Sequence, residues 1–558
     1  REGQALEQAR GLALAQLELL AKGEFDDWLI KAVVNDLKQQ RIRFWNENNS
    51  MRASAMTDAF ILRKDWAAAV GELDRMSGTT KAQVMAFVKE NLRDNYVCVF
   101  KRTGERKDVH KVTKPKITPI DIKRDGKSAW RLDWEKVPSA SLTPEFVDFD
   151  KAIDRRVLAN GIPVACVKNP SNELFSLRYI LDMGTNHDEL LKVALDYLPY
   201  LGTSTVSPRQ LKQDLFKLGL SIDVFASEDR CYVTLSGLEE NLAKGMQLLD
   251  DVLSDCQPNA EALPGLIADI RKSRQDQKKN KGALLNGALF SQARYGARSP
   301  FNDVLTDEKL AALQPGELIA RLRSLKGFKH KVFFYGRKPI DEVVGLLAAH
   351  HRTAAQLRDV PPERNYPELP TTRNEVLFAE YDMVQTEMLL ASKAGPFDVE
   401  KLPYAALFNE YFGSGLSSIV FQEIREAKAL AYGANASYTS PAKRDEAHYV
   451  RAFIGTQADK LPDAVDAMLK LMNDMPMAEA QFEGAKTAAL KVIASTRITK
   501  ENIYWQWDAA QRRGLNYDVR KVNYERIPKI TLADMKTFFD KEIKGRPYTY
   551  CVIGKKAA

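Results

Sequence analysis

The sequence predicts an α+β protein of repeated domains, each with a mostly antiparallel sheet covered by helices. Three stretches share one order of elements: a long helix, a shorter helix opened by a capping residue or proline, and a closing strand rich in β-branched and aromatic residues. The two later stretches are preceded by strands and helices that also match each other. Strand meanders followed by helices favour an antiparallel sheet with its helices on one face.

Length and composition are typical of a chain with several globular domains. Of its 558 residues, 45% are hydrophobic and 28% are charged, which is enough apolar material for sizeable cores. No apolar run approaches the length of a membrane span, so we expect no membrane-spanning segment.

Residues 1–104 match the rear half of one such domain. An amphipathic helix, EQARGLALAQLELLAKG, ends near Gly23, and a long helix follows in DDWLIKAVVNDLKQQRIRFW. A short helix then runs from Thr80 to about Leu92, and the strand Tyr96–Phe100 closes the stretch. The chain starts without Met or a signal-like leader, and its first helix has no preceding partner for its apolar face. We therefore expect a fragment of a longer protein.

Residues 105–145 are predicted to be a linker. Much of the net charge of +8 is concentrated nearby, because Lys101–Lys127 carries ten basic and four acidic residues. Pro115 and Pro119 interrupt this stretch, and it lacks the interleaved aromatic residues typical of a nucleic-acid-binding segment. We interpret it as solvated and expect no nucleic-acid partner.

Residues 146–345 form the first complete copy. It opens with RRVLANGIPVACVK, whose Asn-Gly pair is typical of a hairpin turn, and continues with LFSLRYILDMG. A helix ends at Gly202, a second helix leads to the strand Leu220–Ser227, and VFFYG, Val332–Gly336, closes the copy.

Residues 365–558 form the second complete copy. Its opening strands are EVLFAEYD and TEMLLASKA, and the helix that follows reaches Gly413, which we align with Gly202. The strand Leu430–Ser437 is aligned with Leu220–Ser227, and YTYCVIG closes the copy. Each complete copy is thus predicted to fold as the same α+β domain.

The stretch FGSGLSSIVFQEIREAKALAYG contains the candidate binding residues. Its Gly413-Ser414-Gly415 lacks the third glycine and the lysine of a phosphate loop, so a turn that caps the next helix is favoured. Arg425 and Tyr432 follow, seven residues apart.

The alignment of the two copies makes this pair a candidate. It places Arg425 opposite Leu215 and Tyr432 opposite Ile222, two apolar residues. Two interpretations stay open on the residues alone: a surface arginine beside a strand tyrosine, or a functional pair of a guanidinium and a phenol.

The five cysteines predict neither a disulfide framework nor a zinc knot. They lie far apart and form no C-x-x-C pair, so we interpret them as buried thiols. They leave the compartment undecided, with a periplasmic or secreted location only a guess. The cysteines are Cys98, Cys166, Cys231, Cys256 and Cys551.

The sequence resembles the M16 zinc peptidases, also called inverzincins or insulinase/pitrilysin-type peptidases. LLAKGEFDDWLIKAVVNDLK, FGSGLSSIVFQEIREAKALAYGA and FIGTQADKLPDAVDAML are similar to segments of that family. The resemblance implies four α+β domains of LuxS/MPP-like metallohydrolase architecture, arranged as two linked halves that enclose a peptide chamber. This chain would comprise the rear of domain two, the linker, and domains three and four.

The resemblance also implies that this part of such a protein holds no zinc. The family motif H-x-x-E-H places two histidines on one helix face, with a glutamate as general base. The equivalent positions here are Val193, Asp196 and Tyr197, which are poor zinc ligands. We therefore expect no catalytic residue and no metal ligand in this chain, with zinc and its ligands in the front half.

None of the six histidines supplies a substitute motif. His187 lacks a following Glu-His, and the adjacent His350 and His351 cannot both face one ion from a helix. His110, His330 and His448 are expected to stand alone, in rim or core roles.

In noncatalytic halves of the family, the last domain carries an arginine and a tyrosine in R-x-x-x-x-x-A-Y that hold the substrate backbone. Arg425 and Tyr432 match this pattern within REAKALAYG, although Ala429 stands where the family often has glycine. Gly413-Ser414-Gly415 is similar to the glycine-rich loop of such halves.

The implied function is that of the noncatalytic C-terminal portion of a zinc metalloendopeptidase. Its partners would be a peptide substrate and the N-terminal catalytic half of the same protein. The alternative is a pseudo-peptidase that acts as a scaffold or peptide-binding module. An H-x-x-E-H motif upstream would favour the enzyme over the scaffold.

Overall fold

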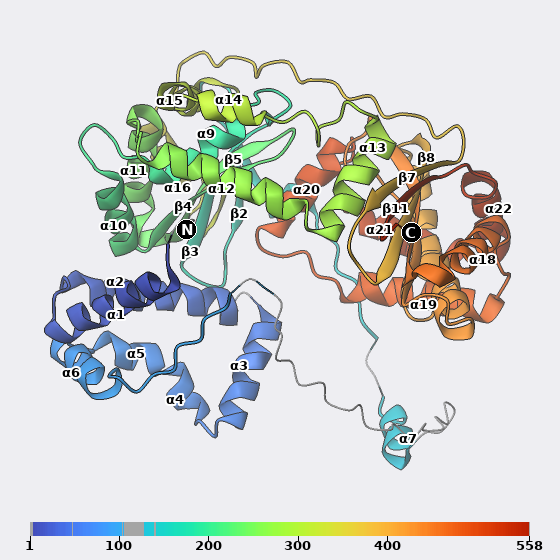
Figure 1. The fold of residues 1–558 in the computed structure, drawn as a ribbon, viewed down its shortest axis with the longest axis horizontal. Coiled ribbons are helices and arrows are strands. Elements are labelled where there is room, and N and C mark those ends of the chain that lie inside the picture. Colours follow the sequence, from blue (N-terminus) through green and yellow to red (C-terminus); the bar gives the residue numbers. More distant parts are fainter. Residues whose placement is uncertain (1–3, 47, 103, 105–127, 139–140, 557–558) are drawn as a thin grey trace. The chain divides into compact units, whose positions relative to one another are not determined.

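The computed structural model describes residues 4–46, 48–102, 104, 128–138 and 141–556, and the chain divides into two compact units (Figure 1). The first unit comprises Arg1–Arg41 and Asn48–Thr143, and the second comprises Ile42–Glu47 and Pro144–Ala558. Most of the predicted linker, and His110 within it, lies outside the described residues.

The described part of the first unit is helical. Helix α1 ends at Gly23, whose φ of 75° is in the left-handed region, and the side chain of Thr80 caps α6 by accepting from the Gln83 amide at 3.3 Å. Helix α1 packs against α6. The helices are α1 (Leu6–Lys22), α2 (Trp28–Arg41), α3 (Asn49–Ile61), α4 (Trp66–Val70), α5 (Glu72–Ser77), α6 (Lys81–Asn91) and α7 (Ala129–Glu135).

The predicted strand Tyr96–Phe100 is wrong for this structure. The segment has no strand assignment, and the side chains of Val97 and Val99 are 90% and 86% exposed. A strand requires the hydrogen-bonding edge of a partner strand, and the described residues of this unit contain no strand. The apolar residues of this segment are therefore not enough to form a strand when the described part of the unit offers no partner strand.

The second unit contains two mixed sheets with the same topology. The first sheet has the order β1-β2-β6-β3-β5-β4, and the second has the order β7-β11-β8-β10-β9. Without β1, the strands match one for one, with parallel pairing in β2–β6 and in β7–β11 and antiparallel pairing elsewhere. The predicted repeat of a mostly antiparallel α+β domain is confirmed.

The strand bounds follow the predicted segments closely. In the first sheet they are β1 (Asp154–Val157), β2 (Pro163–Lys168), β3 (Leu174–Leu181), β4 (Leu220–Ala226), β5 (Cys231–Leu238) and β6 (Lys331–Gly336). In the second sheet they are β7 (Glu375–Glu380), β8 (Gln385–Pro396), β9 (Gly433–Thr439), β10 (Ala447–Gln457) and β11 (Thr549–Gly554).

The alignment of Leu220 with Leu430 does not follow the register of the sheets. Leu220 is already in β4 and pairs with Gly237, whereas Leu430 precedes β9, whose first pair is Gly433 with Gly455. The comparison of Arg425 and Tyr432 with Leu215 and Ile222 therefore has no structural basis.

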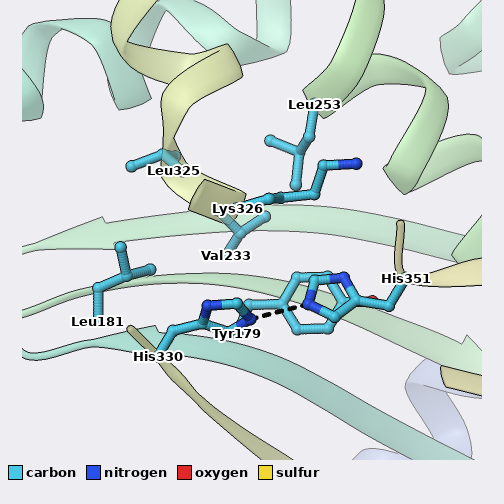
Figure 2. A pocket seen from close by; sticks show the side chains of 8 residues that line it. All are labelled: Tyr179, Leu181, Val233, Leu253, Leu325, Lys326, His330 and His351. Carbon is cyan, nitrogen blue, oxygen red and sulfur yellow. Dashed lines mark hydrogen bonds between the residues drawn. The ribbon is translucent and has the colours of Figure 1, made fainter. Parts of the chain in front are cut away.

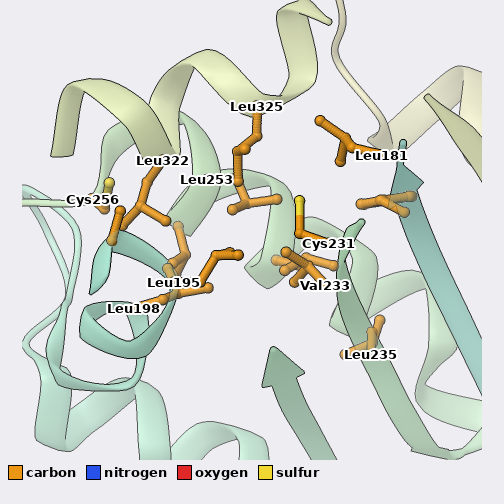
Figure 3. Close-up of a cluster of buried hydrophobic side chains, with 14 of the residues drawn as sticks. Leu181, Leu195, Leu198, Cys231, Val233, Leu235, Leu253, Cys256, Leu322 and Leu325 are labelled. Carbon is orange, nitrogen blue, oxygen red and sulfur yellow. The ribbon is translucent and has the colours of Figure 1, made fainter. Parts of the chain in front are cut away.

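Helices cover one face of each sheet with an apolar core. In the first domain, sheet residues such as Leu177, Leu235 and Phe334 are buried against α9, α11 and α15, and Figure 3 shows part of this cluster. The helices here are α8 (Phe149–Ala152), α9 (Leu191–Tyr197), α10 (Pro208–Leu218), α11 (Leu242–Asp255), α12 (Ala262–Gln277), α13 (Phe290–Tyr295), α14 (Asp307–Ala312), α15 (Pro315–Ser324) and α16 (Ile340–His350).

The last domain repeats this arrangement. Its core joins β8, β9 and β10 to the helices that follow them. These helices are α17 (Leu402–Phe408), α18 (Leu461–Asn473), α19 (Glu479–Ser495), α20 (Asn502–Arg512), α21 (Val519–Arg526) and α22 (Leu532–Glu542).

Each of the two domains packs a helix on the second face of the other domain's sheet. The sequence pattern did not predict these contacts. Tyr504 of α20, from the last domain, stacks on Phe333 of the first sheet with ring centroids 4.0 Å apart. In return, Leu285 of the π-helix η4 (Ala283–Leu289) packs on Leu389 and Ile553 of the second sheet. Each sheet is thus covered on its second face by the other domain (Figure 1).

Four of the five cysteines are buried thiols, as predicted, and burial raises the pKa of Cys231 to about 12. Cys98 is exposed, contrary to the prediction, because it lies in the unpaired segment after α6.

Candidate functional site

The Gly413-Ser414-Gly415 turn joins two π-helical segments, η7 (Asn409–Gly413) and η8 (Phe421–Ala427). A Cβ on Gly413 would lie 1.7 Å from the carbonyl oxygen of Ala436, so only glycine fits at this position. The Ser414 amide donates to the Asn409 carbonyl at 2.7 Å, and Gly415 has a φ of 90°. The close approach of Gly413 to Ala436 and the positive φ of Gly415 therefore explain the two glycines structurally. Ser414 and Gly415 are exposed.

A second tight turn brings the candidate pair together. After η8, Ala429 has a φ of 48°, and the amide of Leu430 donates to the Ile424 carbonyl at 3.0 Å. This left-handed conformation is unusual for alanine and explains why glycine would suit the position. The chain reverses here and leads into β9.

Arg425 lies between two aromatic rings. Its guanidinium carbon is 4.9 Å from the ring centroid of Tyr432 and 4.7 Å from that of Phe421. Cation–π contacts of this kind orient an arginine without using its N–H donors. An ion contact at 3.7 Å joins Arg425 to the neighbouring Glu426.

Tyr432 is held by its backbone and leaves its ring in solvent. Its amide donates to the Gly455 carbonyl at 3.0 Å, while the residue is 75% exposed. The arginine side chain is 37% exposed. The structure thus places Arg425 and Tyr432 side by side with both polar groups accessible, which gives several N–H donors and one hydroxyl on one surface.

Two of the three positions aligned with the zinc motif, Val193 and Tyr197, are part of the core of the first sheet domain. Val193 is buried, and the carboxylate of Asp196 pairs with Lys192 at 3.0 Å. The hydroxyl of the fully buried Tyr197 donates to the carbonyl of Asn259 at 2.5 Å and accepts from its amide at 2.8 Å. These residues do not fit a zinc ion, because one is apolar and two are already paired.

His187 and His448 each make local contacts, in agreement with the expectation for His448. His187 Nδ1 accepts from the Gly184 amide at 3.1 Å, and His448 Nε2 accepts from the Asp398 amide at 3.1 Å. Burial lowers the pKa of both imidazoles.

The expectation that His330 stands alone is wrong. Its Nε2 lies 2.8 Å from Nε2 of His351, a contact between residues 21 positions apart that no local pattern signals. Across the described ranges, no group of three or more His, Cys, Asp or Glu residues has the arrangement of a metal site. Among the helices of the same ranges, none is long and apolar enough to cross a membrane.

Comparisons with known proteins agree with this fold and place the candidate pair within a matched region. Residues 328–489 match the family model described as "Peptidase M16 inactive domain", and this range includes Arg425 and Tyr432. A Bacillus subtilis protein named "Uncharacterized zinc protease YmxG" is 21% identical over 325 residues, which cover 55% of this chain and 75% of that protein. A Mycobacterium leprae "Uncharacterized zinc protease ML0855" is 25% identical over 291 residues, 50% of this chain and 64% of that one.

Two solved structures share the fold. The peptidase M16 inactive domain from Pseudomonas fluorescens has a TM-score of 0.57 at 17% identity and covers 73% of this chain and 98% of its own. The periplasmic protease PqqL from Escherichia coli has a TM-score of 0.58 at 11% identity, and the match spans 97% of this chain but 63% of that one. Residues 328–489 thus match an M16 peptidase domain model, and about half of the chain is similar to proteins named zinc proteases.

Proposed function

We propose that the chain is the noncatalytic portion of an M16-type zinc metallopeptidase and that Arg425 and Tyr432 bind the backbone of its peptide substrate. The observation that carries this proposal is the accessible guanidinium held 4.9 Å above an exposed tyrosine ring. Held in this way, the guanidinium offers fixed N–H donors to a peptide carbonyl, and the phenol offers one O–H donor. Both groups would assist catalysis by orientation rather than carry out the bond cleavage.

The proposed binding surface includes the Gly413-Ser414-Gly415 turn. Ser414 and Gly415 are exposed where the chain leads into η8, the segment that carries Arg425. Gly413 has a structural role, because the absence of a side chain lets the turn approach Ala436 of β9. A change in this turn would therefore be transmitted to the helix that holds the arginine.

The proposed domain organisation is 1–104, linker 105–145, 146–345 and 365–558. In both complete copies, the closing strand lies between a parallel and an antiparallel neighbour, as β6 does between β2 and β3. The segment Tyr96–Phe100 has the same place in its stretch and carries exposed valines. We assign it to a sheet whose other strands come from the N-terminal catalytic half.

In this proposal, the zinc ion is bound by the N-terminal catalytic half. The relatives named above carry zinc in their names, whereas Val193, Asp196 and Tyr197 do not fit the ion. No chemical step is assigned to residues of this chain. Its contribution is substrate binding and the exclusion of water around the substrate.

The test is peptide hydrolysis by the complete protein. We expect an unstructured fluorogenic peptide to be cleaved, and Arg425→Ala to lower kcat/KM. The matched control is Arg298→Ala, which removes another exposed arginine that lies 5.7 Å from a tyrosine ring, that of Tyr366. Equal kcat/KM for the two variants would refute the role of Arg425. Peptide binding without any cleavage, in a complete protein that lacks H-x-x-E-H, would favour the scaffold alternative.

A further inference from the structure

Two buried histidines are in contact on the helix-covered side of the first sheet. His330 precedes β6 and His351 follows α16, and they are 5% and 6% exposed. Their Nε2 atoms are 2.8 Å apart, and the ring of His351 stacks on Tyr179 of β3 with centroids 4.1 Å apart. Figure 2 shows the contact at the wall of a cavity of about 10 Å³, which has room for about one water molecule.

The hydrogen bonds assign the tautomers of both rings. His330 Nδ1 lies 2.7 Å from the Phe328 carbonyl oxygen, which can only accept, so Nδ1 carries the proton. In the neutral ring, Nε2 of His330 then accepts, and Nε2 of His351 must donate. The remaining Nδ1 of His351 is a buried acceptor without a partner in the described part of the chain.

This arrangement has no place for a further proton. A proton on Nε2 of His330 would set two donors against each other, and one on Nδ1 of His351 would create a buried cation with an unpaired donor. Burial, with His330 and Lys326 nearby, lowers the pKa of His351 to about 3. Burial and Lys326 also lower the pKa of His330, against the opposing effect of its bond to Phe328.

The charged neighbours are already paired among themselves. Lys326 of η5 (Leu325–Gly327) bonds to the buried Asp250 of α11 and lies 2.6 Å from Ser254 Oγ. Arg352 bonds to both Asp250 and Asp251. Tyr179 contributes only its ring, because its hydroxyl is buried without a partner among the described residues.

The pair joins two segments that are also paired by their backbones. Beyond His351, Arg358 donates its amide to the Gly327 carbonyl at 2.9 Å, and Lys329 donates to the Arg358 carbonyl at 2.8 Å. Residues 352–374 then lead to β7 of the last domain. The two rings therefore lie where the connector between the sheet domains leaves the first domain.

We propose that His330 and His351 form an acid-sensitive latch, which holds the start of the 352–374 connector against the first sheet domain and releases it when the rings take up protons. A histidine exposed by opening titrates near pH 6.5, whereas burial in the closed form lowers the pKa of both rings. The closed form is thus fully favoured above pH 6.5 and loses stability as the pH falls below it. Between pH 7.5 and 5.0, this linkage raises the opening constant about thirtyfold for His351 alone, whose pKa in the closed form is about 3.

The test is amide hydrogen exchange of the full chain at pH 7.5 and 5.0, corrected for intrinsic exchange rates. We expect the opening constant at Lys329 and Arg358 to rise at least about thirtyfold in the wild-type chain. The amide of Tyr381, bonded to Gly554 in the second sheet, is the internal reference and should stay protected. An equal change at all three amides, or none, would refute the latch.

Two variants separate the histidines from other acid effects. His351→Gln keeps an N–H donor toward His330 but does not titrate, so the rise should shrink by about thirtyfold. His350→Gln removes the adjacent histidine and should retain the whole wild-type rise. If His351→Gln does not fold, His330→Asn, which keeps the donor to Phe328, replaces it. An unreduced rise in the folded variant contradicts the proposal.

Discussion

Arg230 and Asp508 form a buried ion pair that joins the two sheet domains. Arg230 Nη1 lies 2.7 Å from Asp508 Oδ2, and the Nη2–Oδ1 distance is 3.2 Å. The two side chains are 10% and 8% exposed. Because Asp508 is on α20, this bidentate contact fixes the helix that the last domain contributes to the first sheet.

Replacing Asp508 with alanine should destabilise the chain by about 3 kcal/mol, because a buried guanidinium would lose its main partner. The measurement is the free energy of unfolding in urea. The control is Asp276→Ala, which breaks an exposed 2.7 Å pair with Lys272 on one helix and should cost less than about 1 kcal/mol. Equal losses in the two variants would contradict the assignment of Asp508 as an interdomain anchor.

Gly413→Ala should be strongly destabilising, by about 3 kcal/mol or more, since the added Cβ would overlap the Ala436 oxygen at 1.7 Å. Gly484→Ala is the matched control. It lies within α19 with no atom within 4 Å of the added carbon, so it should stabilise the chain by up to about 1 kcal/mol. The same sign of change in both thermal unfolding curves would show that the turn is not packed as described.

Local patterns were enough to find most elements of the sheet domains. The hairpin at Asn160-Gly161 and the closing strands carry turn chemistry or β-branched residues that act over a few positions. The repeat then predicted that both copies fold as the same domain, without any knowledge of long-range contacts. Local signals of this kind do not show whether a partner strand is present. For this reason, Tyr96–Phe100 was wrongly predicted as a strand.

Contacts between distant segments were not predictable in this way. Nothing local relates His330 to His351, and nothing local relates Tyr504 of α20 to Phe333. The shifted register of Leu430 was not predictable either, since it is set by the pairing of β9 with β10. The pairing of Arg425 with Tyr432 was suggested by the family pattern and by an alignment of the two copies that the sheet register does not support, and its role stays a prediction.

Zinc analysis gives a direct test of the core assignment of Val193 and Tyr197. We expect the purified chain to hold no stoichiometric zinc, and dialysis against a chelator to leave its unfolding temperature unchanged. Elemental analysis and thermal unfolding measure the two outcomes. About one tightly held zinc per chain at a histidine-containing site would contradict this prediction.

Ala429→Gly should stabilise the chain by up to about 1 kcal/mol, because glycine adopts the left-handed conformation without the steric cost borne by alanine. The φ of 48° is the basis of this expectation. The control is Ala427→Gly, at the end of η8, where no positive φ offsets the entropic cost of glycine and stability should fall. Urea unfolding of both variants decides the sign.

The proposed roles of the Tyr432 ring and hydroxyl can be separated with two substitutions in the complete protein. Tyr432→Phe keeps the ring that lies 4.9 Å from the Arg425 guanidinium but removes the hydroxyl, whereas Tyr432→Leu removes both. If the hydroxyl donates to the substrate, Tyr432→Phe should lower kcat/KM about tenfold, less than the hundredfold typical of a main oxyanion donor. If the ring acts only by orienting Arg425, Tyr432→Phe should resemble the wild-type enzyme, and Tyr432→Leu should add nothing to Arg425→Ala in a double-mutant cycle. Full activity of both tyrosine variants would exclude a role for Tyr432 in substrate binding, while an additive loss in the double variant would show that its ring acts independently of Arg425.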